Sequence, residues 1–388
     1  MQWADKLSMI QPFYVMEVLA QVKALEGQGR DIVRFMVGEP EFATPQPVLN
    51  AGIQALEQDQ TRYTDARGLA SLRKQIAQWY DRQYGVSVPI HRIIVTPGTS
   101  GAFILAFGIL LNPGDSVAIT DPGYPCYPNI IRMLGGEPYL IPVGPESEYQ
   151  LDAQLLKPAI EKGIRGVLIT SPSNPTGTLI APKVLKEVIE LVGHSKGMVI
   201  SDEIYHGITY GEQAQTALSF SDNVIVINGF SKFFAMTGWR LGWMIVPDEA
   251  VKAVEALAQN LFISAPTISQ HAAQSVFGCQ DQLLDQVAAY DRNRQVMIAR
   301  LRNMGFIIAV EPRGAFYIYA DATHVLKKTG LDDAQQLCTV ILNDVGVAIT
   351  PGLDFGQYRS NVHVRFSYAV GPERVEEGLM RLERFIQK

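Results

Sequence analysis

The chain contains the stretch Asn228-Gly-Phe-Ser-Lys-Phe-Phe-Ala-Met-Thr-Gly-Trp-Arg240, which follows the β-branched run Val224 to Ile227. Such a run predicts a buried strand, and the chain leaves it through Gly229 before presenting Lys232. Lysine forms Schiff bases with carbonyl groups, and arginine clamps phosphate oxygens in a fork. An isolated lysine is most often a solvated surface residue. The whole stretch, however, suits a site that forms an imine and holds a phosphate.

Polar residues follow several short apolar runs along the chain. The runs are 93–95, 117–119, 167–169, 198–200 and 224–227, and helical apolar spacing lies between several of them. Apolar strands that alternate with helices predict an α/β domain with a largely parallel sheet. Ligands of such sheets bind beyond the carboxyl ends of the strands. The polar residues after the runs are therefore expected to line one site, and they include Ser100, Tyr124, Asn174, Asp202 and Lys232.

The length of 388 residues exceeds one comfortable hydrophobic core, so two domains are expected. After residue 280 the pattern changes to a long helical stretch, strand-like segments at 315–319 and 362–367, and a closing amphipathic helix. This pattern predicts a smaller α+β domain formed by residues 1–44 and 281–388. Residues 45–280 are expected to form the large domain.

The composition argues against several partners. The chain has 33 basic and 39 acidic residues, well mixed, with no basic run, so nucleic acid is not expected. The longest apolar run, 102–111, is shorter than the about 20 residues that span a bilayer, which predicts a buried helix and no membrane partner. The three cysteines have neither metal-site nor disulfide spacing. Without an apolar leader, they indicate reduced thiols in a cytoplasmic protein.

The segment Ser231-Lys-x-x-x-Met-Thr-Gly-Trp-Arg240 closely resembles the lysine segment of pyridoxal-phosphate (PLP) enzymes of the aspartate aminotransferase family, class I/II. The resemblance extends from about residue 10 to the end of the chain. It implies the PLP-dependent transferase fold type I. That fold has a large domain with a mostly parallel seven-stranded sheet flanked by helices, plus a smaller α+β domain. It also implies PLP as the cofactor and a homodimer with shared active sites.

The resemblance assigns catalytic roles to the residues at the strand ends. It implies that Lys232 forms the imine with PLP and later shuttles the α-proton, and that Asp202 pairs with the pyridine nitrogen. A carboxylate there keeps the ring protonated, which makes it an electron sink. Asn174 and Tyr205 match the pair that hydrogen-bonds the phenolic oxygen of the cofactor. Taken alone, Asp202 could be a helix N-cap and Asn174-Pro-Thr-Gly177 an ordinary turn.

The phosphate is expected at the start of the helix that opens with Gly98, Thr99 and Ser100. Backbone N–H groups and the helix dipole face an anion there, and Arg240 would add a guanidinium. Many family members have a serine three residues before the lysine. This chain has Gly229 at that position, so the sequence leaves open whether Gly229 or Ser231 contacts the phosphate.

The remaining matched positions concern the substrate and the ring. Arg365 matches the arginine that binds the substrate α-carboxylate, although a strand arginine alone would more often form a surface ion pair. Gly38 would add a backbone contact to the same carboxylate, beside Asn174. Tyr124 matches the aromatic residue that stacks on the pyridine ring. Tyr63 matches the tyrosine that reaches the phosphate from the neighbouring subunit, which is why a homodimer is implied.

The resulting hypothesis is an aminotransferase that moves an amino group between an L-amino acid and a 2-oxo acid by a ping-pong mechanism. A PLP-dependent β-lyase, such as a C–S lyase, is the alternative on the same fold, because a fold alone does not settle the reaction. A ligand-sensing regulator is a third possibility. It would need a DNA-binding segment, and the sequence offers no basic helix for one.

The sequence does not name the amino acid, but it favours a class. The loop Gly98-Thr-Ser-Gly101 carries no cation to hold a distal carboxylate, and burying a bare charge is costly. The expected lining is apolar or aromatic and consists of Phe13, Tyr14, Phe262 and Ile263. Medium-sized neutral or aromatic amino acids are therefore expected to be better primary donors than aspartate. Asn174-Pro175 and Asp121-Pro122 resemble family positions at which cis peptide bonds occur.

Overall fold

A computed structural model describes residues 3–10, 12 and 14–387 and contains a seven-stranded sheet of order β2-β8-β7-β6-β5-β3-β4. The strands are β2 (Ile93–Thr96), β3 (Ser116–Asp121), β4 (Glu137–Pro142), β5 (Gly166–Thr170), β6 (Met198–Asp202), β7 (Ile225–Gly229) and β8 (Gly242–Ile245). Strand β8 pairs antiparallel with both β2 and β7, and the other pairings are parallel. The predicted α/β fold with a mostly parallel seven-stranded sheet is confirmed.

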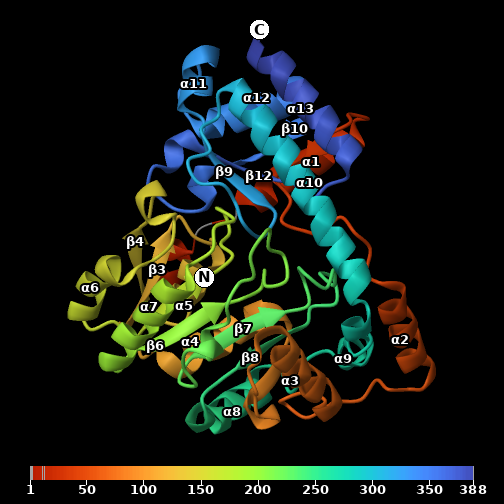
Figure 1. Ribbon diagram of the computed structural model, residues 1–388, viewed down its shortest axis with the longest axis vertical. Coiled ribbons are helices and arrows are strands. Elements are labelled where there is room, and N and C mark those ends of the chain that lie inside the picture. Colours follow the sequence, from red (N-terminus) through yellow and green to blue (C-terminus); the bar gives the residue numbers. More distant parts are fainter. Residues whose placement is uncertain (1–2, 11, 13, 388) are drawn as a thin grey trace.

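Helices cover both faces of this sheet (Figure 1). Helix α4 (Gly98–Leu110) packs on β7 and β8, with α5 (Cys126–Met133) and α8 (Val251–Leu261) beside it. Helices α3 (Ala70–Tyr84), α6 (Ala153–Glu161) and α7 (Pro182–His194) complete the covering layers. On β5, Leu168 joins the core that contains α4, while Val167 and Ile169 join the core that contains α7. Because both faces are buried, the inner strands have runs of consecutive apolar residues, as the sequence indicated.

A smaller sheet lies in the upper part of Figure 1. Its antiparallel order is β11 (Thr350–Pro351), β12 (His363–Ser367) and β9 (Tyr317–Asp321). Nearby, β1 (Val33–Arg34) pairs in parallel with β10 (Val347–Ala348), which joins distant parts of the chain. The helices around them are α1 (Tyr14–Gly27), α11 (Thr323–Thr329), α12 (Ala334–Val345) and α13 (Pro372–Gln387).

Helix α10 (Gln280–Met304) extends from the level of the large sheet to that of the small one (Figure 1). Helices α2 (Gln46–Glu57) and α9 (Thr267–Ala273) pack together beside the large sheet. The chain therefore passes between the two sheets near residues 45 and 280. The domain boundaries placed there stay a prediction.

The two parts of the molecule meet at the end of β3. The buried Asp121 carboxylate accepts backbone N–H groups from Gln357 at 3.0 Å and Tyr358 at 3.2 Å. Both expected cis peptide bonds, Asp121-Pro122 and Asn174-Pro175, are present, and Ser171-Pro172 is a third. Among the described helices, none combines the length and the apolar character needed to cross a membrane.

Two helical glycines provide a matched test of the packing. A Cβ on Gly378 in α13 would lie 2.8 Å from Val33 Cγ1 and still closer to the Phe35 ring, and both neighbours are fully buried. Gly378→Ala should therefore lower the free energy of unfolding by about 1–3 kcal/mol through overpacking. Gly193 in α7 has open space, so Gly193→Ala should raise it by about 0.5–1 kcal/mol. Denaturant titration measures both, and equal shifts would contradict the docking of α13 on β1.

Candidate active site

A cavity of about 640 Å³ lies beyond the carboxyl ends of β3, β5, β6 and β7. Ten of the twelve residues predicted from the sequence line it: Gly38, Thr99, Ser100, Tyr124, Asn174, Asp202, Tyr205, Lys232, Arg240 and Arg365. The small sheet contributes Arg365 and Tyr317, and α1 contributes apolar side chains together with Lys23. The ends of the strands therefore converge as expected, and they bring residues from five separate turns into one cavity.

Lys232 follows β7 and extends into this cavity. Its Nζ donates a hydrogen bond of 2.6 Å to the backbone oxygen of Gly38. Burial lowers the pKa of the Lys232 amine to about 8; nearby Glu39 opposes this shift, and the positive charges of Arg240 and Arg365 add to it. An amine with such a pKa is available as a nucleophile and as a base near neutral pH.

Asp202 ends β6 with its carboxyl group buried. Tyr127 donates its hydroxyl to Oδ2 at 2.5 Å, and the Ile204 N–H reaches Oδ1 at 3.1 Å. Burial raises the pKa of Asp202 to about 6, while these two hydrogen bonds and the charge of Lys232 act against the rise. At pH 7 the group is therefore mainly an anion, and it can face a protonated ring nitrogen.

Tyr127 and Tyr317 were missed in the sequence. Tyr127 stands three residues after Tyr124, and the two rings meet edge to face at 5.2 Å. Tyr317 shares a hydrogen bond of 2.8 Å between its hydroxyl and that of Tyr205. A Cβ on Gly38 would lie 2.5 Å from the Tyr317 hydroxyl, so the backbone can approach there only as glycine. The position of Tyr127 only three residues after Tyr124, in the segment that follows the same strand, was the available signal for the first.

Arg365 lies in β12 and is only 3% exposed. Its Nη1 donates to Asn174 Oδ1 and its Nη2 to the Met36 backbone oxygen, both at 2.8 Å. The guanidinium stacks 4.3 Å from the Tyr317 ring centroid and 4.6 Å from that of Phe355. These hydrogen-bond partners are neutral, so the positive charge remains available to an anion in the cavity. A carboxylate is the planar group that a guanidinium binds best.

Arg240 and the start of α4 form the other cationic end of the cavity. Arg240 has a left-handed backbone (φ 51°), and its Nη1 donates to the Thr237 oxygen at 3.0 Å. Gly98 (φ +69°) does not line the cavity, but a Cβ there would lie 2.7 Å from Arg240 Nη2. Glycine thus allows the guanidinium to lie against the helix start. Ser231 lines the cavity near this end, whereas Gly229 does not.

Comparisons with known proteins agree with this geometry. Residues 30–382 match the family model described as aminotransferase class I and II. The chain is 40% identical over 377 residues to a valine–pyruvate aminotransferase of Mycobacterium tuberculosis, covering 96% of each. It is 36% identical to a (5-formylfuran-3-yl)methyl phosphate transaminase of Methanocaldococcus jannaschii, covering 99% of this chain and 100% of that one. A crystal structure of an aminotransferase from Mycobacterium tuberculosis superposes with a TM-score of 0.95 at 39% identity, covering 100% and 99% of the two chains.

The chain belongs to the class I and II aminotransferases. It is an enzyme of the PLP-dependent aspartate aminotransferase family and transfers amino groups. The match spans nearly the whole chain, as the lysine segment indicated.

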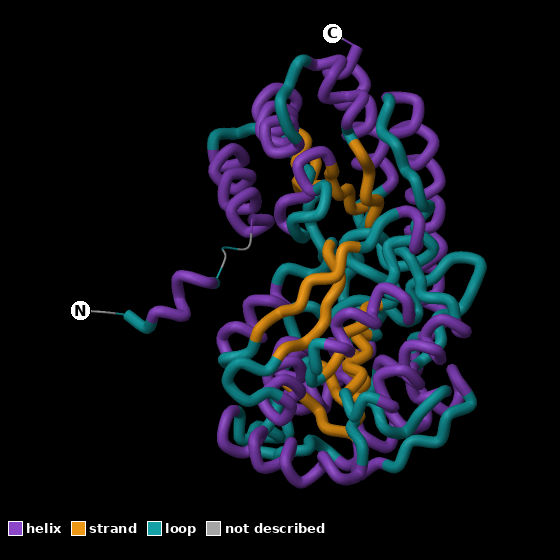
Figure 2. The backbone as a smooth tube through the Cα atoms, turned by 90° about the vertical axis from the view of Figure 1, so that its left-hand side faces the viewer, coloured by secondary structure: helices purple, strands orange, loops and turns teal. Residues whose placement is uncertain are grey.

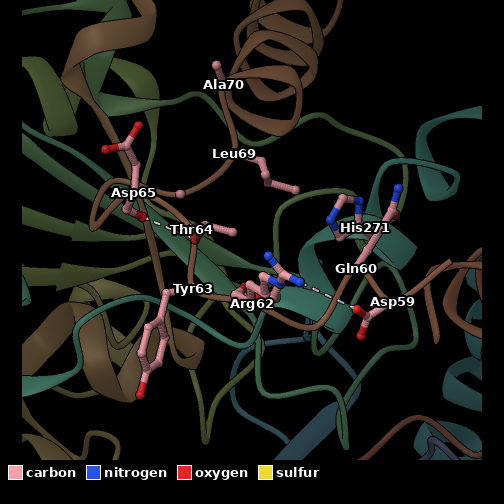
Figure 3. Close-up of a pocket in the computed structure, with 11 residues that line it drawn as sticks. Asp59, Gln60, Arg62, Tyr63, Thr64, Asp65, Leu69, Ala70 and His271 are labelled. Atoms are coloured by element: carbon pink, nitrogen blue, oxygen red, sulfur yellow. Dashed lines mark hydrogen bonds and ion pairs between the residues drawn. The ribbon is translucent and has the colours of Figure 1, made fainter.

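One predicted site residue of this aminotransferase lies outside the cavity of its own chain. Tyr63 is 79% exposed and borders a separate hollow of about 330 Å³. Figure 3 shows its side chain extending away from Leu69 and Ala70, where the chain enters α3. The proposed contact with a neighbouring subunit stays a prediction.

The expected lining of the substrate pocket differs from the residues that line the cavity of this chain. Tyr14, Phe262 and Ile263 do not line this cavity, and Phe13 lies outside the described residues. Helix α1 contributes Val15, Met16, Leu19 and Lys23. Tyr14 borders an adjacent hollow, and Phe262 packs beside Gly101 of α4. The apolar spacing of α1 predicted a helix, but it could not tell which of its faces meets the cavity.

Proposed function

We propose that this aminotransferase uses PLP to move an amino group between an L-amino acid and a 2-oxo acid by a ping-pong mechanism. The observation that carries the proposal is the placement of Lys232. Its amine, with a lowered pKa, shares one cavity with the buried Asp202 carboxyl and the buried Arg365 guanidinium. This combination offers a nucleophilic amine, an anion for a protonated nitrogen and a cation for a carboxylate.

The residues present fit PLP. Thr99, Ser100 and Arg240 offer helix N–H groups and a guanidinium to a phosphate, at the end of the cavity where Gly98 leaves room. The carboxylate of Asp202 would hold the ring nitrogen. Tyr124 would cover the ring, and the hydroxyl of Tyr205 and the amide of Asn174 would hold its phenolic oxygen. When bound, PLP supplies an electron sink that stabilises negative charge at the α-carbon of the substrate.

The protein's own groups then bind and move protons. Arg365 and the backbone at Gly38 orient the α-carboxylate, with Asn174 held against the guanidinium at 2.8 Å. Lys232 Nζ takes the α-proton and returns it, because an amine with a pKa of about 8 exchanges protons readily near neutral pH. Asp202, as an anion, keeps its partner nitrogen protonated through the cycle.

A homodimer with shared active sites is part of the proposal. Tyr63 is largely exposed and does not line its own chain's cavity. The segment 3–10 projects from the body of the molecule (Figure 2) and exposes Trp3, Leu7 and Met9, while contacting α5 through Lys6 and the Met133 oxygen. Exposed apolar side chains gathered on one segment support an interface with another chain. The free thiols of Cys126, Cys279 and Cys338 support the proposal of a reducing, cytoplasmic setting.

The reaction type is tested by stoichiometry. With amino donor alone, the holoenzyme should form one oxo acid per site and stop, and added 2-oxoglutarate should restore turnover. A β-lyase would instead continue to release pyruvate without any acceptor.

Lys232→Ala should retain cofactor through the phosphate and ring contacts but lose nearly all transamination. Borohydride reduction of the wild type should label Lys232, and labelling of another lysine would refute the assignment.

Asp202→Ala should lower kcat by several orders of magnitude, because an unprotonated ring is a poor electron sink. The control is Asp285→Ala, which removes an exposed carboxylate from α10 and should leave kcat unchanged. Steady-state kinetics and the cofactor absorption spectrum measure the effect. Turnover close to that of the wild type in Asp202→Ala would remove Asp202 from the proposed role.

The substrate class is tested by a donor profile. Helix α1 contributes three apolar residues and Lys23 to the cavity wall, and the start of α4 carries no cation for a distal carboxylate. A relative named for valine and pyruvate supports neutral donors. Values of kcat/KM for alanine, valine, leucine and phenylalanine should exceed that for aspartate by tenfold or more, about 1.4 kcal/mol of discrimination. A tenfold preference for aspartate would mean that a cation reaches the distal pocket.

A further inference from the structure

A second polar cluster lies next to the active site but does not open into it. Glu203 follows Asp202 directly, is 0% exposed and is not among the residues that line the cavity. Its Oε1 accepts three hydrogen bonds, from Ser201 Oγ at 3.1 Å, Thr216 Oγ1 at 3.0 Å and the Ala217 N–H at 2.9 Å. Its Oε2 has no hydrogen-bond partner among the described residues.

The nearest basic group to this oxygen is a buried histidine. His206 is 2% exposed, and its Nδ1 lies 3.5 Å from Glu203 Oε2. Tyr84 hydrogen-bonds the same Nδ1 at 2.8 Å, and the ring also hydrogen-bonds the backbone of Ser171. A neutral imidazole has one N–H, which the Ser171 carbonyl takes, so Nδ1 is an acceptor and the Tyr84 hydroxyl is its donor.

An ionised Glu203 would not suit this arrangement. Its Oε2 would face His206, whose Nδ1 is an acceptor, and would have no donor among the described residues. A buried anion without a counter-charge is also costly. A neutral carboxylic acid removes the unpaired charge, because Oε1 still accepts its donors as a carbonyl oxygen and the proton lies on Oε2, on the side of His206.

We propose that Glu203 is a positioning residue, held as a neutral carboxylic acid with its proton on Oε2, the oxygen that faces His206. The turn that carries Asp202 and Tyr205 then bears a single negative charge, on Asp202. The inference rests on the proposed function only for its catalytic consequence.

The surrounding charges favour this protonation state. Burial raises the pKa of Glu203 to about 8; its three hydrogen bonds oppose the shift, and the neighbouring charge of Asp202 adds to it. Burial lowers the pKa of His206 to about 3, so the histidine does not take the proton. The other titratable groups that face Glu203 are Tyr80 and Tyr84, and burial raises the pKa of both well above the usual range, so both stay neutral.

The same contacts fix the backbone of the catalytic turn. The Glu203 N–H donates to the Ile227 oxygen of β7 at 2.8 Å, and the His206 N–H donates to the Glu203 oxygen at 2.9 Å. The Ile204 N–H donates to Asp202 Oδ1 at 3.1 Å. The Glu203 side chain accepts hydrogen bonds from Thr216 and Ala217 and so links this turn to that segment. It therefore fixes the positions of Asp202 and Tyr205 from the side of the turn that faces away from the cavity.

Infrared difference spectroscopy of the resting holoenzyme tests the protonation state without any turnover. At pH 7 the wild type should show a carboxylic-acid band that Glu203→Gln removes. The matched control is Glu187→Gln, the same change at a half-exposed carboxylate paired with Lys183 on α7, which should keep the band. The wild-type band should also disappear as the pH rises through about 8. A wild type that lacks the band at pH 7 overturns the proposal, even if Glu203→Gln fails to fold.

Stability against pH gives a second readout. Between pH about 4.5 and 6.5, the native state holds one proton on Glu203 and the unfolded state holds one proton on His206. The two residues therefore add no pH dependence to the free energy of unfolding. Between pH 6.5 and about 8, only the native state still holds a proton, on Glu203. The denaturant midpoint of the wild type should therefore fall with rising pH, relative to that of Glu203→Gln. A relative rise, or no change, overturns the proposal.

Rescue by glutamine tests the positioning role. Glutamine has a carbonyl oxygen and a donor, so Glu203→Gln should retain kcat within about threefold, less than 1 kcal/mol of barrier. Glu203→Ala should lower kcat at least tenfold with little change in cofactor affinity. A Gln variant as impaired as the Ala variant overturns the proposal. The infrared and stability results stand apart from transamination, so failure of the proposed function would be recognised separately.

Discussion

The buried carboxyl group of Asp202 is the constraint around which the rest of the site is arranged. A charge removed from water must be met by donors and by opposite charge. The end of β6 supplies both, because α5 brings the Tyr127 hydroxyl, the following turn brings the Ile204 N–H, and β7 brings Lys232 to the same cavity. Strand β6 lies inside the sheet between β5 and β7, so its end is enclosed on both sides.

The positive charges of the cavity exceed what its own carboxylates balance. Lys232, Arg240 and Arg365 line one space, and each arginine helps to lower the pKa of the lysine. Like charges held together in a partly dry cavity favour anionic ligands, and they also favour the neutral form of the amine. The arginines lie on different elements, one before β8 and the other on β12. A ligand with two anionic ends, or an anionic ligand at each end, completes this charge pattern.

The strand-end residues could be predicted because two rules act together. Apolar runs mark the buried strands, and the turns after parallel strands converge on one edge of the sheet. Strand β4 was not among the runs, because Glu137 and two prolines interrupt it, and it is an edge strand where proline is tolerated. Tyr317 and the α1 wall were missed because they reach the cavity through contacts between distant parts of the chain. No local pattern specifies which face of a helix meets such a cavity.

The ionisation states of Asp202 and Glu203 depend on their surroundings in the fold and could not be predicted from the sequence. Two adjacent carboxyl groups would have similar pKa values in an unfolded chain, and the repulsion between them would separate these values only slightly. In the fold, Asp202 meets a tyrosine O–H, a backbone N–H and a nearby ammonium group, which favour the anion. Glu203 is fully buried beside a neutral histidine, its Oε2 has no donor among the described residues, and the negative charge of Asp202 lies nearby. The ionisation of one therefore favours the neutrality of the other, and a single turn can carry one catalytic charge and its neutral support.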